Sequence, residues 1–270
     1  MLELTQLSKA IILAIIQGIT EWLPVSSSGH LAITEKLLNY EASLTFDVAL
    51  HFGTLMSVFV YFGKDITDII QDMLKLKFKT ENAKLGIYLA IATIPAAIIG
   101  FLFKNAFEKI FSNLIVVALG FSITGIILII ASLPIIKQDN NLTISKSIII
   151  GTSQILSLLP GVSRSGTTTS TGILLGLKEK TALKFSFLMS IPIIFGANIL
   201  TISNETLPKE LIWATLVSFI IGLLSLHLIY KHILTNKKNL RYFGIYALLL
   251  ALAIAIFSIM SQNLRVLTPH

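Results

Sequence analysis

Long apolar runs without a charge constrain this chain more than any other feature. Residues 114–134 and 242–260 are two such runs, and about 20 apolar residues are what a helix needs to cross the hydrocarbon core of a bilayer. Of the 270 residues, 54% are hydrophobic and 13% are charged, whereas soluble domains carry about 25% charged residues. Apolar and polar positions do not alternate, as they would in barrel strands. The sequence therefore predicts an all-α integral membrane protein.

Six apolar segments are long enough to span the bilayer. Two further apolar regions, residues 8–38 and 147–177, are each interrupted midway by Pro, Gly and Ser, which leaves arms too short to cross. This pattern is typical of a re-entrant helical hairpin, whose tip is tolerated at membrane depth where protein or water covers its backbone. The six predicted spans are residues 46–63, 85–103, 113–134, 183–202, 211–230 and 241–260.

The distribution of cations favours one orientation. If residues 64–84 are cytoplasmic, fourteen of the 21 Lys and Arg residues lie on the cytoplasmic side and six lie outside, with Arg164 inside the second hairpin. Loops rich in Lys and Arg face the cytoplasm, so both termini are expected outside. Topology accounts for the net charge of +7, and nucleic acid is not an expected partner. Cysteine is absent, which excludes disulfides and thiolate chemistry.

The two interrupted regions contain similar phrases, LPVSSSGHLA at 23–32 and LPGVSRSGTT at 159–168. Aligning their Leu-Pro pairs with one inserted residue, Gly161, places Ser26, Ser27, Ser28 and Gly29 opposite Ser163, Arg164, Ser165 and Gly166. Three spans separate the two regions, so the halves 1–134 and 135–270 are expected to form an inverted-topology repeat within a single membrane domain. The two hairpin tips are then expected to meet near the midplane.

The second tip carries an arginine, which costs at least ~2.5–3.5 kcal/mol at membrane depth. An anionic partner is therefore expected beside Arg164. One alternative is an internal ion pair with Glu21, and the other, which we favour, is a phosphate ligand, because the guanidinium fork suits phosphate oxygens. The turn surrounds Arg164 with hydroxyls and with glycines whose backbone N–H groups can face an anion. These are Ser163, Ser165, Thr167, Thr168, Gly161 and Gly166.

The first tip has the inventory for nucleophilic attack with acid–base assistance, namely a carboxylate, three hydroxyls and an imidazole. They belong to Glu21, Ser26, Ser27, Ser28 and His30. Structural roles remain open for two of them: Ser28 as the N-cap of a helix beginning at Gly29, and His30 as a hydrogen-bonded structural residue.

Two pairs of polar residues share a spacing of four. Gln17 and Glu21 lie on one face of a helical arm and can point at one ligand. Asp47 and His51 repeat the spacing at the start of the first span. We interpret the second pair as structural, with Asp47 as an acid at a helix start.

These residues resemble a known family. QGITE at 17–21 fits the pattern (E/Q)xxxE, and PGVSRSGTT at 160–168 fits PGxSRSxxT, the two signatures of undecaprenyl-pyrophosphate phosphatases of the bacitracin-resistance type. EWLPVSSSGH and FSFLMSIPIIFGAN are also similar to this family, so the resemblance covers nearly the whole chain. Position 17 is Gln where many relatives carry Glu, which weakens a role for it as a base or a metal ligand.

The resemblance implies a multi-pass bacterial inner-membrane enzyme that removes the terminal phosphate of a C55 isoprenoid diphosphate. This reaction recycles the lipid carrier for cell-wall synthesis, and overproduction confers bacitracin resistance. The implied site is built from two re-entrant hairpins, faces the periplasm or cell exterior and uses a divalent cation, Mg or Ca. The implied catalytic residues are Glu21, Ser27 as nucleophile, His30 and Arg164. The expected substrate-binding residues are Gln17, Ser26, Ser28, Gly161, Ser163, Ser165, Gly166 and Thr168.

The expected partners are a polyprenyl diphosphate lipid and membrane lipids, with a homodimer as a further candidate. The main alternative is a secondary transporter or lipid flippase for a phosphorylated substrate, because inverted repeats with broken helices also suit alternating access. A purely structural role for the protein would not explain the free-energy cost of placing the charged side chains of Arg164 and Glu21 in the membrane.

Overall fold

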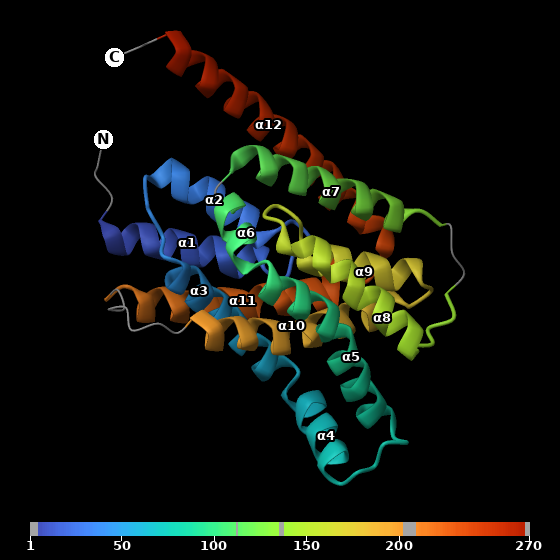
Figure 1. The fold of residues 1–270 in the computed structure, drawn as a ribbon. Helices are drawn as coiled ribbons and strands as arrows, with labels where there is room; N and C mark the ends of the chain where they lie inside the picture. The colour runs from blue at the N-terminus through green and yellow to red at the C-terminus, as the bar shows by residue number, and fades with distance from the viewer. Residues whose placement is uncertain (1–4, 112, 135–137, 202–208, 268–270) are drawn as a thin grey trace.

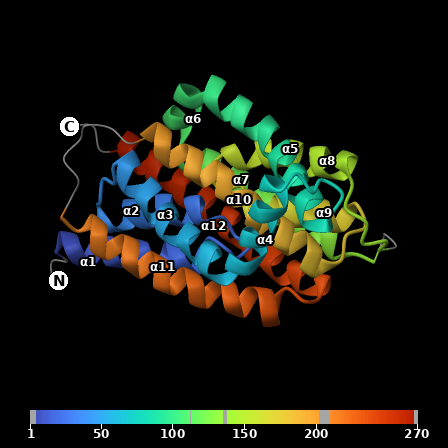
Figure 2. The same cartoon turned by 90° about the horizontal axis from the view of Figure 1, so that it is seen from below.

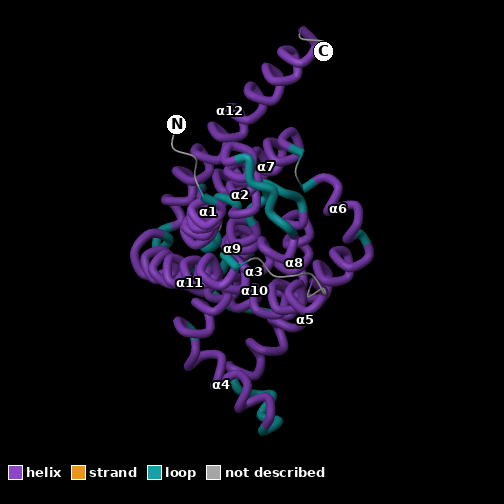
Figure 3. The backbone as a smooth tube through the Cα atoms, turned by 90° about the vertical axis from the view of Figure 1, so that its left-hand side faces the viewer, coloured by secondary structure: helices purple, strands orange, loops and turns teal. Residues whose placement is uncertain are grey.

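The computed structural model describes residues 5–111, 113–134, 138–201 and 209–267. Within these ranges all regular secondary structure is helical (Figure 1, Figure 3), as expected. The elements, in chain order, are α1 (Gln6–Thr20), α2 (Ser27–Leu38), α3 (Leu44–Tyr61), α4 (Gly63–Leu74), α5 (Glu81–Leu102), α6 (Lys104–Ile110), α7 (Leu114–Ser132), α8 (Ile144–Ser153), η1 (Gln154–Leu158), α9 (Arg164–Leu174), α10 (Glu179–Thr201), α11 (Leu211–Leu228), η2 (Ile229–Ile233), η3 (Lys237–Asn239) and α12 (Leu240–Leu267).

Six helical segments of the described residues are long and apolar enough to cross a membrane, so the chain is a multi-pass membrane protein. The number and order of the predicted spans are confirmed, with ends that differ by a few residues; the predicted end at residue 202 lies outside the described residues. Large apolar side chains such as Ile212 and Trp213 stay exposed on these helices, as a lipid-facing surface requires. The segments are Leu44–Tyr61, Glu81–Leu102, Leu114–Ser132, Glu179–Ile199, Leu211–Ile233 and Lys237–Met260.

The two interrupted regions form pairs of short helices joined by turns. Helices α1 and α2 have 15 and 12 residues, and α8 and α9 have 10 and 11, all shorter than the ~20 residues of a spanning helix. Helix α1 packs against α2, and α8 against α9. Each region is therefore a helical hairpin, as its Pro, Gly and Ser residues predict.

In both hairpins a serine side chain caps the second helix. The Ser26 hydroxyl accepts a hydrogen bond from the N–H of Gly29 at 3.2 Å, and the Ser163 hydroxyl accepts one from the N–H of Gly166 at 3.0 Å. The alternative role of Ser28 as the cap of a helix beginning at Gly29 is therefore wrong: α2 begins at Ser27, and Ser26 is its N-cap. An N-cap side chain reaches the N–H two or three residues ahead, which suits Ser26, whereas the Ser28 Oγ lies 3.2 Å from the Ser26 Oγ.

The turns of the two hairpins contact each other and a common neighbour. The Ser165 hydroxyl donates to the Leu23 carbonyl of the first turn at 3.0 Å. Thr124 of α7 holds the second turn, because its hydroxyl donates to the Gly161 carbonyl at 3.0 Å and accepts from the Ser163 N–H at 2.9 Å. Gly161 has φ +87°, and a Cβ there would collide with the Val117 carbonyl. Helix α7 in turn lies along α12 (Figure 1).

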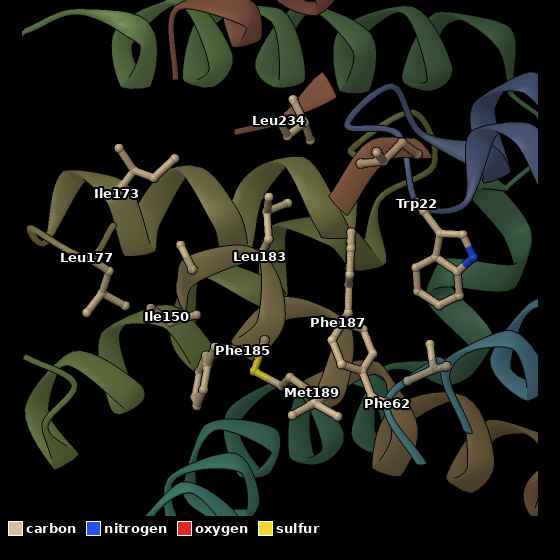
Figure 4. Close-up of a cluster of buried hydrophobic side chains, with 14 of the residues drawn as sticks. Trp22, Phe62, Ile150, Ile173, Leu177, Leu183, Phe185, Phe187, Met189 and Leu234 are labelled. Carbon is tan, nitrogen blue, oxygen red and sulfur yellow. The ribbon is translucent and has the colours of Figure 1, made fainter. Parts of the chain in front are cut away.

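The main hydrophobic cluster joins buried side chains of α10 to those of the second hairpin, of α3, α5, α7 and α11, and to Trp22 of the first turn. Trp22 is fully buried and meets the edge of Phe187, with ring centroids 5.2 Å apart (Figure 4). On the other side, α11 packs along α1 and α3 (Figure 2). The first turn is thus held between two packed groups of helices, and Glu21 precedes its buried tryptophan.

Candidate active site

Glu21 is the centre of the polar contacts between the two hairpins. It is 6% exposed and follows the last residue of α1, where its N–H donates to the Gln17 carbonyl. Its Oε1 accepts from Nη2 of Arg164 at 2.6 Å, and its Oε2 accepts from the Ser27 hydroxyl at 2.6 Å. The structure therefore brings three of the four predicted catalytic residues into direct contact.

A second group of nitrogen atoms surrounds the same Oε2 of Glu21. Gln17 Nε2 donates to it at 3.0 Å, and Nδ1 of His51 lies 3.1 Å from it. Gln17 is fully buried, and its Nε2 is also 2.9 Å from His51 Nδ1, while its Oε1 has no hydrogen-bond partner. With Arg164 and the Ser27 hydroxyl, four side chains thus direct polar groups at the Glu21 carboxylate.

Arg164 forms the internal ion pair that the sequence left as an alternative. Its side chain is 14% exposed, its Nη1 donates to the Ser186 carbonyl at 3.3 Å, and its guanidinium lies 5.5 Å from the Trp22 ring centre. A guanidinium has five N–H donors, and the bonds to Glu21 and to the Ser186 carbonyl use two of its nitrogens. Ion pairing to Glu21 thus leaves donor capacity for an anionic ligand.

His30 makes its hydrogen bonds away from Glu21. Its Nδ1 lies 2.7 Å from the Ser26 carbonyl oxygen, and its Nε2 lies 2.7 Å from the Tyr246 hydroxyl of α12. The histidine that contacts Glu21 is His51, for which the sequence pattern favours a structural role. His30, the predicted catalytic histidine, therefore pairs with Tyr246 and not with Glu21.

The remaining predicted ligands of the second turn hold its backbone. Ser163 and Ser165 lie with their hydroxyl oxygens 3.3 Å apart. The Thr168 hydroxyl donates to the Arg164 carbonyl at 2.8 Å and lies 2.6 Å from the Ser186 hydroxyl. Direct binding of substrate by these residues stays a prediction, as it does for Gly161 and Gly166 in the turn, and for Ser26, Ser28 and Gln17 on the first hairpin.

Polar residues of two spanning helices, α3 and α10, also lie at the site, and the sequence motifs do not include them. His51 and Thr54 of α3 approach Gln17, with the Thr54 hydroxyl 3.4 Å from Gln17 Nε2, and Ser186 of α10 approaches Arg164. A usable signal was present: His51, Thr54 and Ser57 recur every three residues in an otherwise apolar span. Thr54 and Ser57 are fully buried, so this stripe faces protein, as polar residues in membrane helices do.

The charges of the site are balanced before any ligand arrives. Glu21 carries one negative charge and Arg164 one positive charge, and two helices start beside this pair, α2 at Ser27 and α9 at Arg164. Helix N-termini favour anions. Among the described residues, no three His, Cys, Asp or Glu side chains cluster so as to hold a metal ion. The Asp and Glu side chains of the site therefore offer few ligands for a metal ion by themselves.

These features define a class: helical membrane proteins in which two short hairpins bring a serine, a glutamate and an arginine together. The profile of the family "Bacitracin resistance protein BacA" matches residues 10–253, and the chain belongs to that family. A protein of Methanococcus vannielii is 39% identical over 253 residues, covering 92% of this chain and 98% of the relative. Its name is undecaprenyl-diphosphatase.

Two further relatives have the same name. The protein of Thermosipho melanesiensis is 40% identical over 243 residues, covering 90% of this chain and 96% of the relative. That of Caldicellulosiruptor bescii is 41% identical over 260 residues, covering 92% of this chain and 96% of the relative. The similarity thus extends across both hairpins.

Proposed function

We propose that this chain is an undecaprenyl-diphosphatase, a hydrolase that converts undecaprenyl diphosphate to undecaprenyl phosphate and inorganic phosphate. The relatives that share about 40% of its residues carry this name. The observation that carries the proposal is the contact of Ser27 and Arg164 with one buried carboxylate, Glu21, at 2.6 Å each. A nucleophile, a proton acceptor and an anion-binding cation are the parts that phosphoryl transfer requires.

Ser27 is the proposed nucleophile. Its hydroxyl already donates to Glu21 Oε2, so the proton passes to Glu21 as Oγ forms a bond to the terminal phosphorus. The bond from that phosphorus to the bridging oxygen breaks, and undecaprenyl phosphate leaves. Water then attacks the phosphorus of the phosphoserine, the bond to Ser27 Oγ breaks, and Oγ takes back the proton from Glu21. Inorganic phosphate leaves with the oxygen and both hydrogens of the water, which restores Ser27 and the Glu21 carboxylate.

Arg164 and the two helix starts stabilise the transition state. Charge spreads over the equatorial phosphoryl oxygens during transfer, and the N–H donors of Arg164 that are not used by Glu21 can bind them. The first N–H groups of α2 and α9 add positive potential without a further charged side chain. Membrane depth strengthens these interactions because protein and lipid have a low dielectric constant.

We also propose a divalent cation, Mg²⁺ or Ca²⁺, as cofactor. Both ions prefer oxygen ligands, and Mg²⁺ is commonly held by one or two carboxylates together with substrate phosphates. The Glu21 carboxylate and the unpartnered Oε1 of buried Gln17 are the side-chain oxygens that would hold such an ion. The bound ion would neutralise charge on the diphosphate. Gln17 would be a weaker ligand than Glu21, because its amide is neutral.

The membrane arrangement follows from the same proposal. We infer that residues 8–38 and 147–177 are re-entrant hairpins that enter from opposite faces, and that the halves 1–134 and 135–270 form an inverted-topology repeat. The similar N-caps of α2 and α9 and the contact between the two turns support it. The excess of cations in the segments assigned to the cytoplasm supports an active site that opens to the periplasm or cell exterior.

In the bacterial inner membrane this reaction would regenerate the monophosphate lipid that carries cell-wall precursors. The polyprenyl tail would lie against the apolar exterior of the helices while the diphosphate enters the polar turns. Overproduction would confer bacitracin resistance, which fits the family's name.

Phosphate release by the purified chain in detergent tests the function. We expect inorganic phosphate and undecaprenyl phosphate from undecaprenyl diphosphate, and a loss of both products in Ser27→Ala. A transporter or flippase needs two compartments and releases no phosphate in micelles. Absence of phosphate release by a folded wild-type chain supplied with Mg²⁺ or Ca²⁺ would exclude the proposed hydrolysis and favour that alternative.

A further inference from the structure

The residue directly before the proposed nucleophile has an unusual backbone. Ser26 has φ +66° and ψ 99°, although it carries a side chain. Side-chain-bearing residues rarely adopt positive φ, and such conformations persist only where the surroundings hold them. The direction of the Ser27 hydroxyl depends on this turn. Whatever holds the Ser26 backbone therefore also positions the proposed nucleophile.

His30 supplies the side-chain contact to that backbone. The Ser26 carbonyl oxygen accepts from the His30 N–H at 3.3 Å and lies 2.7 Å from its ring Nδ1. A carbonyl oxygen is only an acceptor, so Nδ1 must carry the proton. In the neutral imidazole, Nε2 is then an acceptor, and the Tyr246 hydroxyl, 2.7 Å away, donates to it. Both ring nitrogens are thus engaged.

Tyr246 reaches this turn from the far end of the chain. It belongs to α12, 216 residues after His30, and its ring lies nearly parallel to the imidazole, with 8° between the planes and 5.8 Å between the centroids. Phe121 of α7 meets the imidazole edge-on, with centroids 5.3 Å apart. The imidazole is therefore fixed from three sides, by its own helix, by α7 and by α12.

We propose that Tyr246 and His30 are positioning residues, in which Tyr246 fixes the tautomer and orientation of His30, and His30 Nδ1–H holds the Ser26 carbonyl so that Ser27 faces Glu21. This inference rests on the proposed function and refines the role of His30 in it. Proton transfer to His30 would require the 2.7 Å bond from Tyr246 to be broken first. Glu21, by contrast, already accepts the Ser27 hydroxyl.

Three substitutions of His30 separate positioning from acid–base catalysis. An Asn amide nitrogen lies near the place of Nδ1 and can donate to the Ser26 carbonyl, whereas a Gln amide nitrogen lies near the place of Nε2 and cannot. We expect His30→Asn to keep kcat within about tenfold of wild type, and His30→Gln and His30→Ala to lose roughly 100-fold or more, the scale of a misplaced reacting group. KM should change little, because the binding donors are elsewhere.

Equal loss of kcat in His30→Asn and His30→Ala would overturn the proposal and restore a proton-transfer role for His30, since general acid–base catalysis contributes about 10²–10⁴-fold and no amide replaces it. The expression and the elution profile of each variant in detergent are compared with wild type, so that a misfolded variant is identified before its kcat is interpreted.

Tyr246→Phe tests the second contact. It keeps the stacked ring and removes the hydroxyl, so we expect kcat to fall about fivefold, the value of one neutral hydrogen bond. Tyr242→Phe, one turn earlier on α12 where the hydroxyl meets Arg241, is the matched control and should be unchanged. Adding Tyr246→Phe to His30→Asn should have no further effect, because Asn does not reach Tyr246. Additive losses in the double variant would contradict the proposal.

Imidazole ¹⁵N chemical shifts give a readout that does not depend on turnover. With ¹⁵N-histidine labelling and assignment by His30→Asn, we expect His30 to be the Nδ1–H tautomer, with an Nε2 shift that changes in Tyr246→Phe and not in Tyr242→Phe. An Nε2–H tautomer would refute the positioning role whether or not the chain proves to be a phosphatase. The expected tautomer in a chain that releases no phosphate would refute the proposed function alone.

Discussion

Ser27 is distinguished from its two neighbours by what its hydroxyl contacts. Ser26 caps α2, and Ser28 lies against Ser26, whereas Ser27 donates to Glu21. We expect Ser27→Ala to be nearly inactive, while Ser26→Ala and Ser28→Ala keep measurable turnover at normal expression, since losing a cap costs ~0.5–2 kcal/mol of stability. Rapid acid quench with labelled substrate should reveal phosphoserine at position 27. Turnover of Ser27→Ala comparable to Ser28→Ala would instead assign the attack to water.

Arg164 is held by Glu21 through one of its terminal nitrogens, and the remaining donors are proposed to bind phosphate. Arg164→Lys keeps the charge and loses the two-pronged contact. Losing one or two charge-assisted hydrogen bonds of ~1.5–3 kcal/mol each predicts at least ~10-fold lower activity. The measurement is kcat/KM in detergent on protein of unchanged yield. Activity within a factor of two of wild type would show that the arginine serves the ion pair alone.

The residues around Glu21 show which parts of the site could be predicted from the sequence. A serine, a glutamate and an arginine at the broken helices were predictable, because intramembrane charge is costly and is retained for a purpose. The two histidines were not. His30 lies three residues from Ser27, yet its ring turns toward α12, while His51 comes to Glu21 from α3. Spacing along one helix cannot specify contacts that packing between helices decides.

At the scale of elements, Pro, Gly and Ser inside apolar runs predict the two pairs of short helices. The residue at which α2 begins could not be predicted in this way. Three successive serines, Ser26 to Ser28, all satisfy the preference for an N-cap. The positive φ of Ser26 decides among them, and it depends on contacts from His30 and beyond. The preference of serine for the N-cap position locates the turn, but contacts in the tertiary structure determine which of the three serines is the N-cap.

The second turn depends on close packing against α7. Gly161→Ala introduces a side chain at φ +87° and against the Val117 carbonyl, so we expect a loss of stability of about 1–3 kcal/mol. Gly196→Ala is the control, since a Cβ there meets open space inside α10. Thermal unfolding in detergent should show a lower apparent Tm for Gly161→Ala alone. Equal Tm values would mean that the turn adapts without strain.

The whole molecule offers a direct test of orientation, because it contains no native cysteine. Glu41 follows the first hairpin and is exposed, and Lys77 is exposed between α4 and α5. We expect Glu41→Cys to react with an impermeant maleimide in intact spheroplasts and Lys77→Cys to react only after lysis. The reverse pattern would place the reaction on the cytoplasmic side.

The tryptophan that packs beside Arg164 also gives the protein an optical probe. Trp22 is fully buried with the guanidinium 5.5 Å from its ring, and the second tryptophan, Trp213, is 61% exposed on α11. Replacing Trp213 with Phe leaves a single fluorophore at the site. Its emission should then respond when an anion draws Arg164 away from the indole, so equilibrium binding of a lipid diphosphate becomes measurable in Ser27→Ala, where no substrate is consumed.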